Sequence, residues 1–203
     1  MRHLFEYRPF SELYSDAEKL DRVFVSGMNC FRVPGTGRGN GMGGGYSARE
    51  VADRLAIRDV LTRYFLGLDH QDKAMVASCF APAIEAVISG NVLPPGREAV
   101  IGYMFGDASR PAAQSKVVHR MHFMGQIHII LEGDEAQTET YAYAHLTAER
   151  DGGLVMRRRG LRYLDSLRRV DGAWLIYRRR HTAEFEVHET PEFVSENIAT
   201  RVV

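Results

Sequence analysis

Apolar and polar residues alternate with two different periods along this chain, helical just after residue 46 and strand-like in the second half. The string Ser47-Ala-Arg-Glu50 places a serine and a glutamate three residues apart, which is the capping box that begins many helices. The apolar positions that follow have helical spacing and predict a helix with one buried face, fading near Asp69 to Gln71; they are Val51, Leu55, Ile57, Val60, Leu61, Tyr64 and Leu68.

Shorter elements are predicted between residues 72 and 105. Asp72 is expected to cap a second helix that contains Met75, Val76 and Phe80, and Pro82 is expected to end it. The remaining predictions here are a strand over 84–89, a turn at Gly90-Asn91 and a third short helix over 98–105.

From residue 117 onward the pattern is almost entirely that of β-strands. Acidic residues and glycines typical of hairpin turns separate four long runs, over 117–131, 137–149, 154–170 and 173–187. Three helices followed by an antiparallel meander indicate an α+β fold. A long curved sheet wrapped around the helices would leave an apolar cavity for a small ligand.

Composition narrows the function classes. Lys and Arg number 26 against 26 Asp and Glu, a balance that argues against coating nucleic acid or an anionic membrane. The basic runs 157–159 and 178–180 fall in predicted strands and are interpreted as solvated outer faces. Without an apolar signal or membrane-spanning stretch, the expected location is the cytoplasm.

The ends of the chain differ from its middle. Residues 1–46 are expected to form an N-terminal arm and a flexible glycine-rich linker, 47–190 the main domain, and 191–203 a C-terminal tail. The glycines of 34–45 lack a following Gly-Lys-Ser/Thr, so nucleotide binding is disfavoured.

Three residues carry the candidate chemistry. Tyr64 and Asp69 lie at the end of the first helix, and His122 lies in a strand about fifty residues later. A carboxylate that orients an imidazole, together with a phenol donor, suits proton abstraction from an organic molecule. The acids and histidines lack compact metal-ligand spacing, so no metal site is expected.

The order of several short motifs resembles the SnoaL-like branch of the NTF2-like superfamily. The motifs are Tyr64-Phe-Leu-Gly-Leu-Asp69-x-x-Asp72, Phe80-Ala-Pro, Gly96-Arg-Glu-Ala99, His122-x-x-Gly-Gln126, Glu132-Gly-Asp-Glu-Ala136, Thr140-Tyr-Ala-Tyr-Ala144, Arg162-Tyr-Leu-Asp165, Arg168 and Asp171-Gly-Ala-Trp174. The resemblance covers about residues 47–187 and implies a cone-shaped α+β barrel, with a curved, mostly antiparallel sheet wrapped around about three N-terminal helices.

The resemblance also implies roles for particular residues. Asp69 matches the family's helix-end aspartate, His122 its pocket histidine and Tyr64 a phenol of several dehydratases. His145 is expected to be a second pocket imidazole, as in scytalone dehydratase, and the other expected substrate contacts are Tyr143, Met124 and Gln126. Ala144 stands near an acidic position of the bile-acid dehydratase, so that substrate is disfavoured.

The expected function is a cofactor-independent lyase acting by dehydration or elimination on a small hydrophobic organic substrate. His122 would be the general base, oriented by Asp69, with Tyr64 as hydrogen-bond donor. Isomerisation or polyketide-type cyclisation by the same residues is the first alternative. A non-catalytic ligand-binding module and a small structural subunit of a ring-hydroxylating dioxygenase, docked through residues 1–33, remain open. The resemblance also implies a homodimer or homotrimer.

Overall fold

The computed structural model of the chain describes residues 45–106 and 117–193, so most of the predicted arm and tail lies outside the described residues. The described part is an α+β fold, as predicted. Its elements are α3 (Ala48–Asp69), α4 (Lys73–Ala77), α5 (Arg97–Phe105), β1 (Phe80–Ile88), β2 (Asn91–Val92), β3 (Val117–Glu132), β4 (Glu135–Arg150), β5 (Gly153–Val170) and β6 (Ala173–Glu189).

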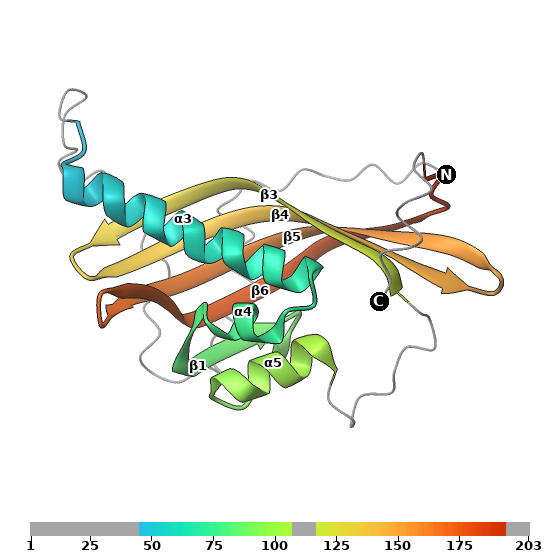
Figure 1. The fold of residues 1–203 in the computed structure, drawn as a ribbon, viewed down its shortest axis with the longest axis horizontal. Coiled ribbons are helices and arrows are strands. Elements are labelled where there is room, and N and C mark those ends of the chain that lie inside the picture. The colour runs from blue at the N-terminus through green and yellow to red at the C-terminus, as the bar shows by residue number, and fades with distance from the viewer. Residues whose placement is uncertain (1–44, 107–116, 194–203) are drawn as a thin grey trace, which may run out of the picture. The chain divides into compact units, whose positions relative to one another are not determined.

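The strands form one curved, unclosed sheet in the order β2-β1-β6-β5-β4-β3. Neighbouring strands are antiparallel except β1 and β6, which run parallel. Helix α3 lies across one face of the sheet and packs on β3 and β6, while α4 packs on α3 and α5 on β1 (Figure 1). No helix among the described residues is long and apolar enough to cross a membrane.

Two of the tight hairpin turns, those that join β4 to β5 and β5 to β6, use the residues that such turns require. Asp151 and Gly152 join β4 to β5, and Asp171 and Gly172 join β5 to β6, all four with positive φ. Two consecutive positive-φ residues match the right-handed twist of the flanking strands, and Asp-Gly adopts them at low cost. These turns fix the register of the long meander that carries most of the site.

Helix α3 begins as predicted, but its buried apolar face begins later along the helix than predicted. The Ser47 hydroxyl accepts from the Glu50 amide at 3.2 Å, and a Glu50 carboxylate oxygen accepts from the Ser47 amide at 2.8 Å. Val51 and Leu55 are exposed, contrary to the predicted stripe. In these first turns the buried position is Asp53, which an ion-pair network holds against the sheet.

The second helix ends earlier than predicted. Asp72 does cap it, accepting from the Met75 amide at 2.8 Å, but α4 stops at Ala77 and Phe80 begins β1. Pro82 therefore lies in a strand instead of ending a helix. The β1–β6 register shifts between Phe80 and Glu85, and such an irregularity tolerates a residue that cannot donate to the ladder.

Candidate functional site

The last residue of α3 reaches across to the middle of β3. An Asp69 carboxylate oxygen lies 2.6 Å from His122 Nδ1, and its second oxygen accepts from the His122 backbone N–H at 3.0 Å. The two side chains are only 16% and 9% exposed. Phe65 is also on α3, and its ring lies 5.8 Å from the imidazole of His122. Helix α3 therefore both contacts this imidazole and orients it.

This arrangement selects one form of the imidazole. A carboxylate accepts, so Nδ1 of a neutral His122 carries the proton and Nε2 keeps its lone pair. Asp69 also stabilises the imidazolium that forms once Nε2 takes a proton. The pair therefore has the geometry of an oriented general base.

His122 and Tyr64 line one cavity of about 470 Å³ between the helices and the inner face of the sheet. Its volume suits a small organic molecule. The apolar part of the wall is formed by Leu68, Ile88, Met104, Ala144, Leu146 and Leu161.

Tyr64 is a neutral phenol in this wall. Burial raises its pKa, and burial raises that of the adjacent Tyr163 well above the usual range. The Tyr64 hydroxyl lies 3.9 Å from the Met104 sulfur, and the Arg179 guanidinium lies 4.0 Å from the centre of its ring. Near neutral pH, Tyr64 can only act as a hydrogen-bond donor or acceptor, not as a phenolate base.

Beneath Tyr64 lies a buried ion pair. Arg179 and Asp165 face each other on β6 and β5, form two hydrogen bonds of 2.7 Å, and have no exposed side-chain surface. Burial alone would lower the pKa of Arg179, but the Asp165 carboxylate raises it, so the guanidinium stays charged. The prediction that the run 178–180 is solvated is therefore wrong at its central residue.

The prediction of a solvated outer face is also partly wrong for the other arginine run, residues 157–159. Arg157 and Arg159 line the cavity, as does Arg120 of β3. Alternation along a strand places residues 157 and 159 on one face and residue 158 on the other, so the spacing did indicate that 157 and 159 share a face. The sequence did not indicate which of the two faces of the strand lines the cavity.

A second imidazole in the cavity comes from His181 and not from His145. His181 is 7% exposed and its ring lies 4.7 Å from that of Tyr163. Burial and the positive charges of Arg179 and Arg159 lower the pKa of His181 to about 3. The cavity thus holds one imidazole oriented by a carboxylate and one kept neutral.

The four predicted substrate contacts are not brought together with His122. Tyr143, Met124 and Gln126 line a separate hollow of about 690 Å³ beside Phe185. His145 lines neither hollow, and its buried Nδ1 has no hydrogen-bond partner in the described part of the chain. No three His, Cys, Asp or Glu side chains among residues 45–106 and 117–193 are grouped as metal ligands.

Comparison with known proteins gives one family and a consistent fold. Residues 49–180 match the SnoaL-like domain. No curated protein matches the chain significantly in sequence.

Three similar structures illustrate the fold. Hexachlorocyclohexane dehydrochlorinase LinA-type3 from Novosphingobium barchaimii is 15% identical with a TM-score of 0.59, covering 72% of this chain and 97% of that one. A putative scytalone dehydratase from Novosphingobium aromaticivorans is 19% identical with a TM-score of 0.57, covering 70% and 91%. A protein of unknown function from Mycobacterium tuberculosis is 25% identical with a TM-score of 0.52, covering 72% and 80%.

Proposed function

The chain belongs to the SnoaL-like family and has its NTF2-like cone fold, and from this premise we propose that it is a cofactor-independent lyase with His122 as general base. The observation that carries the proposal is the 2.6 Å contact between Asp69 and His122 Nδ1 at the wall of the cavity. Dehydrochlorinase and dehydratase, the names of two similar structures, both denote eliminations.

In the proposed reaction Nε2 of His122 takes a proton from a carbon of the bound substrate. The electrons of that C–H bond form the new double bond, and the group on the neighbouring carbon leaves with its own bonding pair. Asp69 stabilises the imidazolium through Nδ1, and the Tyr64 hydroxyl donates a hydrogen bond to the leaving oxygen or to a developing oxyanion. A mostly buried site strengthens both interactions because the local dielectric is low.

The test is mass spectrometry of hydroxylated ketones and polyketide-like acids incubated in heavy water with wild type, His122→Ala and His128→Ala. His128 is exposed on the same strand and provides a matched control. Loss of water with wild type and His128→Ala, but not with His122→Ala, is the expected result. Deuterium uptake without mass loss would instead indicate an isomerase.

Two outcomes contradict the lyase. Product formation by His122→Ala at the wild-type rate would remove His122 from the chemistry. Unchanged compounds that co-elute with the protein in gel filtration would indicate a binding module.

A further inference from the structure

The charges around the cavity do not balance. Arg120, Arg157 and Arg159 line it, and Glu186 is the one carboxylate in its described lining. Glu186 is shared: it lies 2.7 Å from His188, 3.3 Å from Arg159 and 4.0 Å from Arg157. One carboxylate divided among three basic groups leaves the wall with an excess of positive charge.

Arg120 contributes most to this excess. It is half-buried and makes no ion pair with any described residue; the one charge that acts on it appreciably is Asp69, already engaged by His122. Burial lowers the pKa of Arg120, yet a guanidinium remains protonated. A partly desolvated cation that no described carboxylate pairs is stabilised by an anion that enters the cavity.

Strand register places this charge beside the base. His122, Ala144, Arg159 and Glu186 lie opposite one another on β3, β4, β5 and β6, in a single row across the sheet. In the adjacent row Arg120 faces Leu146, which faces Arg157. Side chains two residues apart share a face, so Arg120 lies about 7 Å along the strand from His122.

The small side chain of Ala144 leaves space in the first row. Neighbouring strands are about 4.8 Å apart, so the backbones of His122 and Arg159 are separated by about 10 Å with only a methyl group between them. The buried Nε of Arg159 makes no hydrogen bond with any described residue, although a Glu186 oxygen lies 3.3 Å away. A planar anionic group above Ala144 would have Arg159 on one side in the same row, and His122 on the other side with Arg120 diagonal to it in the next row.

We propose that the cavity binds organic acids, with the carboxylate held by Arg120 and Arg159 and the apolar body placed against the leucines beside His122. Guanidinium groups suit a carboxylate because their planar donors match its two oxygens. Arg157, which is 43% exposed, adds positive potential that attracts the anion. As a statement about the substrates of the lyase, this proposal rests on the proposed function. As a statement about binding, it does not depend on whether the protein is a lyase.

The test compares acids with their uncharged amides. Dissociation constants of benzoate, 3-phenylpropanoate, benzamide and 3-phenylpropanamide are measured by calorimetry on the full chain at pH 7.5 and near-physiological salt. Wild type is expected to bind the better acid roughly tenfold more tightly than its amide, the range of a charged hydrogen bond. Arg120→Gln should abolish most of that preference, and Arg120→Lys should restore part of it.

Arg58→Gln is the matched control, since Arg58 is exposed on α3 and the substitution removes the same charge outside the cavity. It should keep the preference. Amides that bind as well as acids, equal losses in Arg120→Gln and Arg58→Gln, or no binding of either acid at millimolar concentration would each overturn the proposal.

His122→Ala separates this inference from the proposed function. The variant should lose turnover and still prefer acids, because the carboxylate is held elsewhere. A protein that turns over neutral substrates through His122 but shows no preference for acids would retain the lyase and lose the anion site.

Discussion

Asp69 holds His122 at two points, and this determines what a substitution there would do. One carboxylate oxygen takes the backbone N–H and the other faces Nδ1, so both oxygens are in use. The backbone contact places the strand against the end of the helix, while the ring contact sets the tautomer. A side chain that keeps the first contact and reverses the second would isolate the electrostatic role from the structural one.

Asp69→Asn is such a change. Its amide oxygen can still accept from the backbone, but its NH2 then faces Nδ1, which must become an acceptor and leave the proton on Nε2. The base would be blocked without being removed. We expect kcat to fall on the order of 10³-fold, with KM and Tm changing little, by analogy with other carboxylate–imidazole pairs.

Steady-state kinetics and thermal unfolding of Asp69→Asn beside Asp72→Asn check this. Asp72 caps α4 and is not among the described cavity residues, and asparagine caps a helix about as well as aspartate, so its variant should keep both the rate and the Tm of wild type. A fully active Asp69→Asn would show that the tautomer of His122 does not matter.

His181 makes stability depend on pH. Its pKa falls from 6.5 to about 3 in the folded protein because the ring is buried beside arginines. Below pH 6.5 the unfolded chain binds a proton at His181 that the folded chain does not. The contribution of His181 to the free energy of unfolding is therefore full above pH 6.5 and is lost as the pH falls toward 3. The slope within that window approaches about 1.4 kcal/mol per pH unit.

Urea unfolding at pH 6.5, 5.5 and 4.5 measures the slope. The His181→Gln variant should show a flatter dependence than wild type, whatever its absolute stability, and His128→Gln, an exposed control, should follow wild type. Parallel curves for all three proteins would mean that His181 is protonated in the folded state.

At the scale of elements, the junction of α3 and α4 depends on a missing side chain. A Cβ added to Gly67 would lie 2.7 Å from a methyl carbon of the buried Val76 and 3.1 Å from its backbone nitrogen. The Gly67 carbonyl also accepts from the Asp72 amide at 2.9 Å. The two helices approach here because position 67 is glycine, and this approach sets where α3 ends at Asp69.

Gly67→Ala should therefore destabilise the fold by about 1–3 kcal/mol, the usual cost of overpacking. Helix propensity alone predicts the opposite sign, since alanine in a helix interior is favoured over glycine by about 1 kcal/mol. Urea unfolding decides between them, with Leu66→Ala as a control at a position 46% exposed. A stabilised Gly67→Ala would mean that α4 can move away without loss.

The elements themselves were largely predictable, for local reasons. The capping box, the Asp-Gly turns and the two-residue period of the long strands each act over a few neighbouring residues. The failures lie where tertiary contacts override local preference. Phe80 continues a helical pattern but pairs with Ile176 of β6, and Val51 and Leu55 are exposed while the charged Asp53 is buried.

At the scale of the whole molecule, the same division applies to the site. Tyr64, Asp69 and His122 were singled out by residue type and family resemblance, and the structure brings them to one cavity or its border. The cavity arginines and His181 were not singled out from the sequence. Which face of a strand points inward depends on the curvature of the sheet and on bulges between distant strands. A bulge between Met124 and Ile127 illustrates the difficulty, since it shifts the alternation of β3 just after His122.

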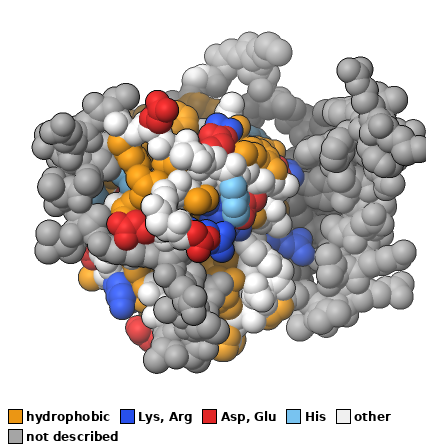
Figure 2. All heavy atoms as spheres, turned by 90° about the vertical axis from the view of Figure 1, so that its right-hand side faces the viewer, with side chains coloured by type: hydrophobic (Ala, Val, Ile, Leu, Met, Phe, Trp, Pro, Cys, Tyr) orange, Lys and Arg blue, Asp and Glu red, His pale blue; other side chains and the backbone are white. Residues whose placement is uncertain are grey.

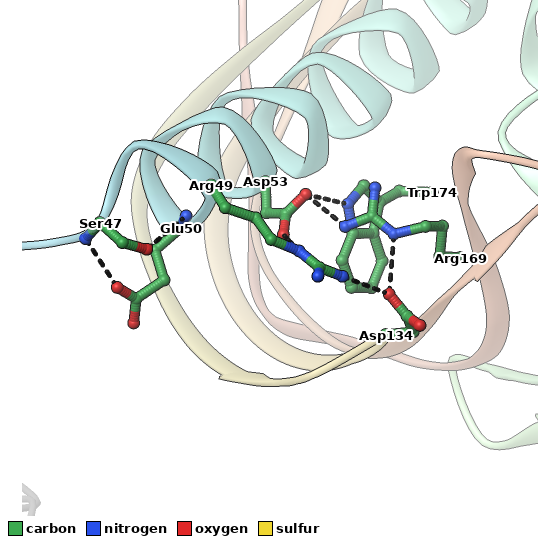
Figure 3. A network of polar contacts seen from close by, with 7 residues as sticks. All are labelled: Ser47, Arg49, Glu50, Asp53, Asp134, Arg169 and Trp174. Carbon is green, nitrogen blue, oxygen red and sulfur yellow. Dashed lines mark hydrogen bonds and ion pairs between the residues drawn. The ribbon is translucent and has the colours of Figure 1, made fainter.

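Helix α3 also carries a second polar cluster at its other end. Asp53 pairs with Arg169 and accepts from Trp174 Nε1 at 3.3 Å, while Asp134 accepts from Arg169 and Arg49 at 2.9 and 3.0 Å (Figure 3). The bond from Arg169 chiefly lowers the pKa of Asp53. This cluster fastens the start of the helix to the β3–β4 turn and to β5 and β6.

The opposite end of the sheet, at the β4–β5 turn, presents a different surface. Figure 2 views that end and shows basic, acidic and histidine side chains meeting near the middle of the described surface. Asp53 and Asp69 are sixteen residues apart on one helix, about 24 Å along its axis. The anchoring cluster and the proposed catalytic pair thus occupy separate ends of α3.

This separation predicts that stability and catalysis can be lost independently. Asp53→Asn removes the charge that pairs Arg169 and should lower Tm by several degrees, while kcat and KM of the folded protein stay within about twofold, as for distant sites. Asp69→Asn should do the reverse. Thermal unfolding followed by kinetics at a temperature where circular dichroism shows both variants folded provides the comparison. If Asp53→Asn lowered kcat as much as Asp69→Asn under those conditions, helix α3 would have to transmit strain along its whole length, and its anchored end would belong to the catalytic machinery.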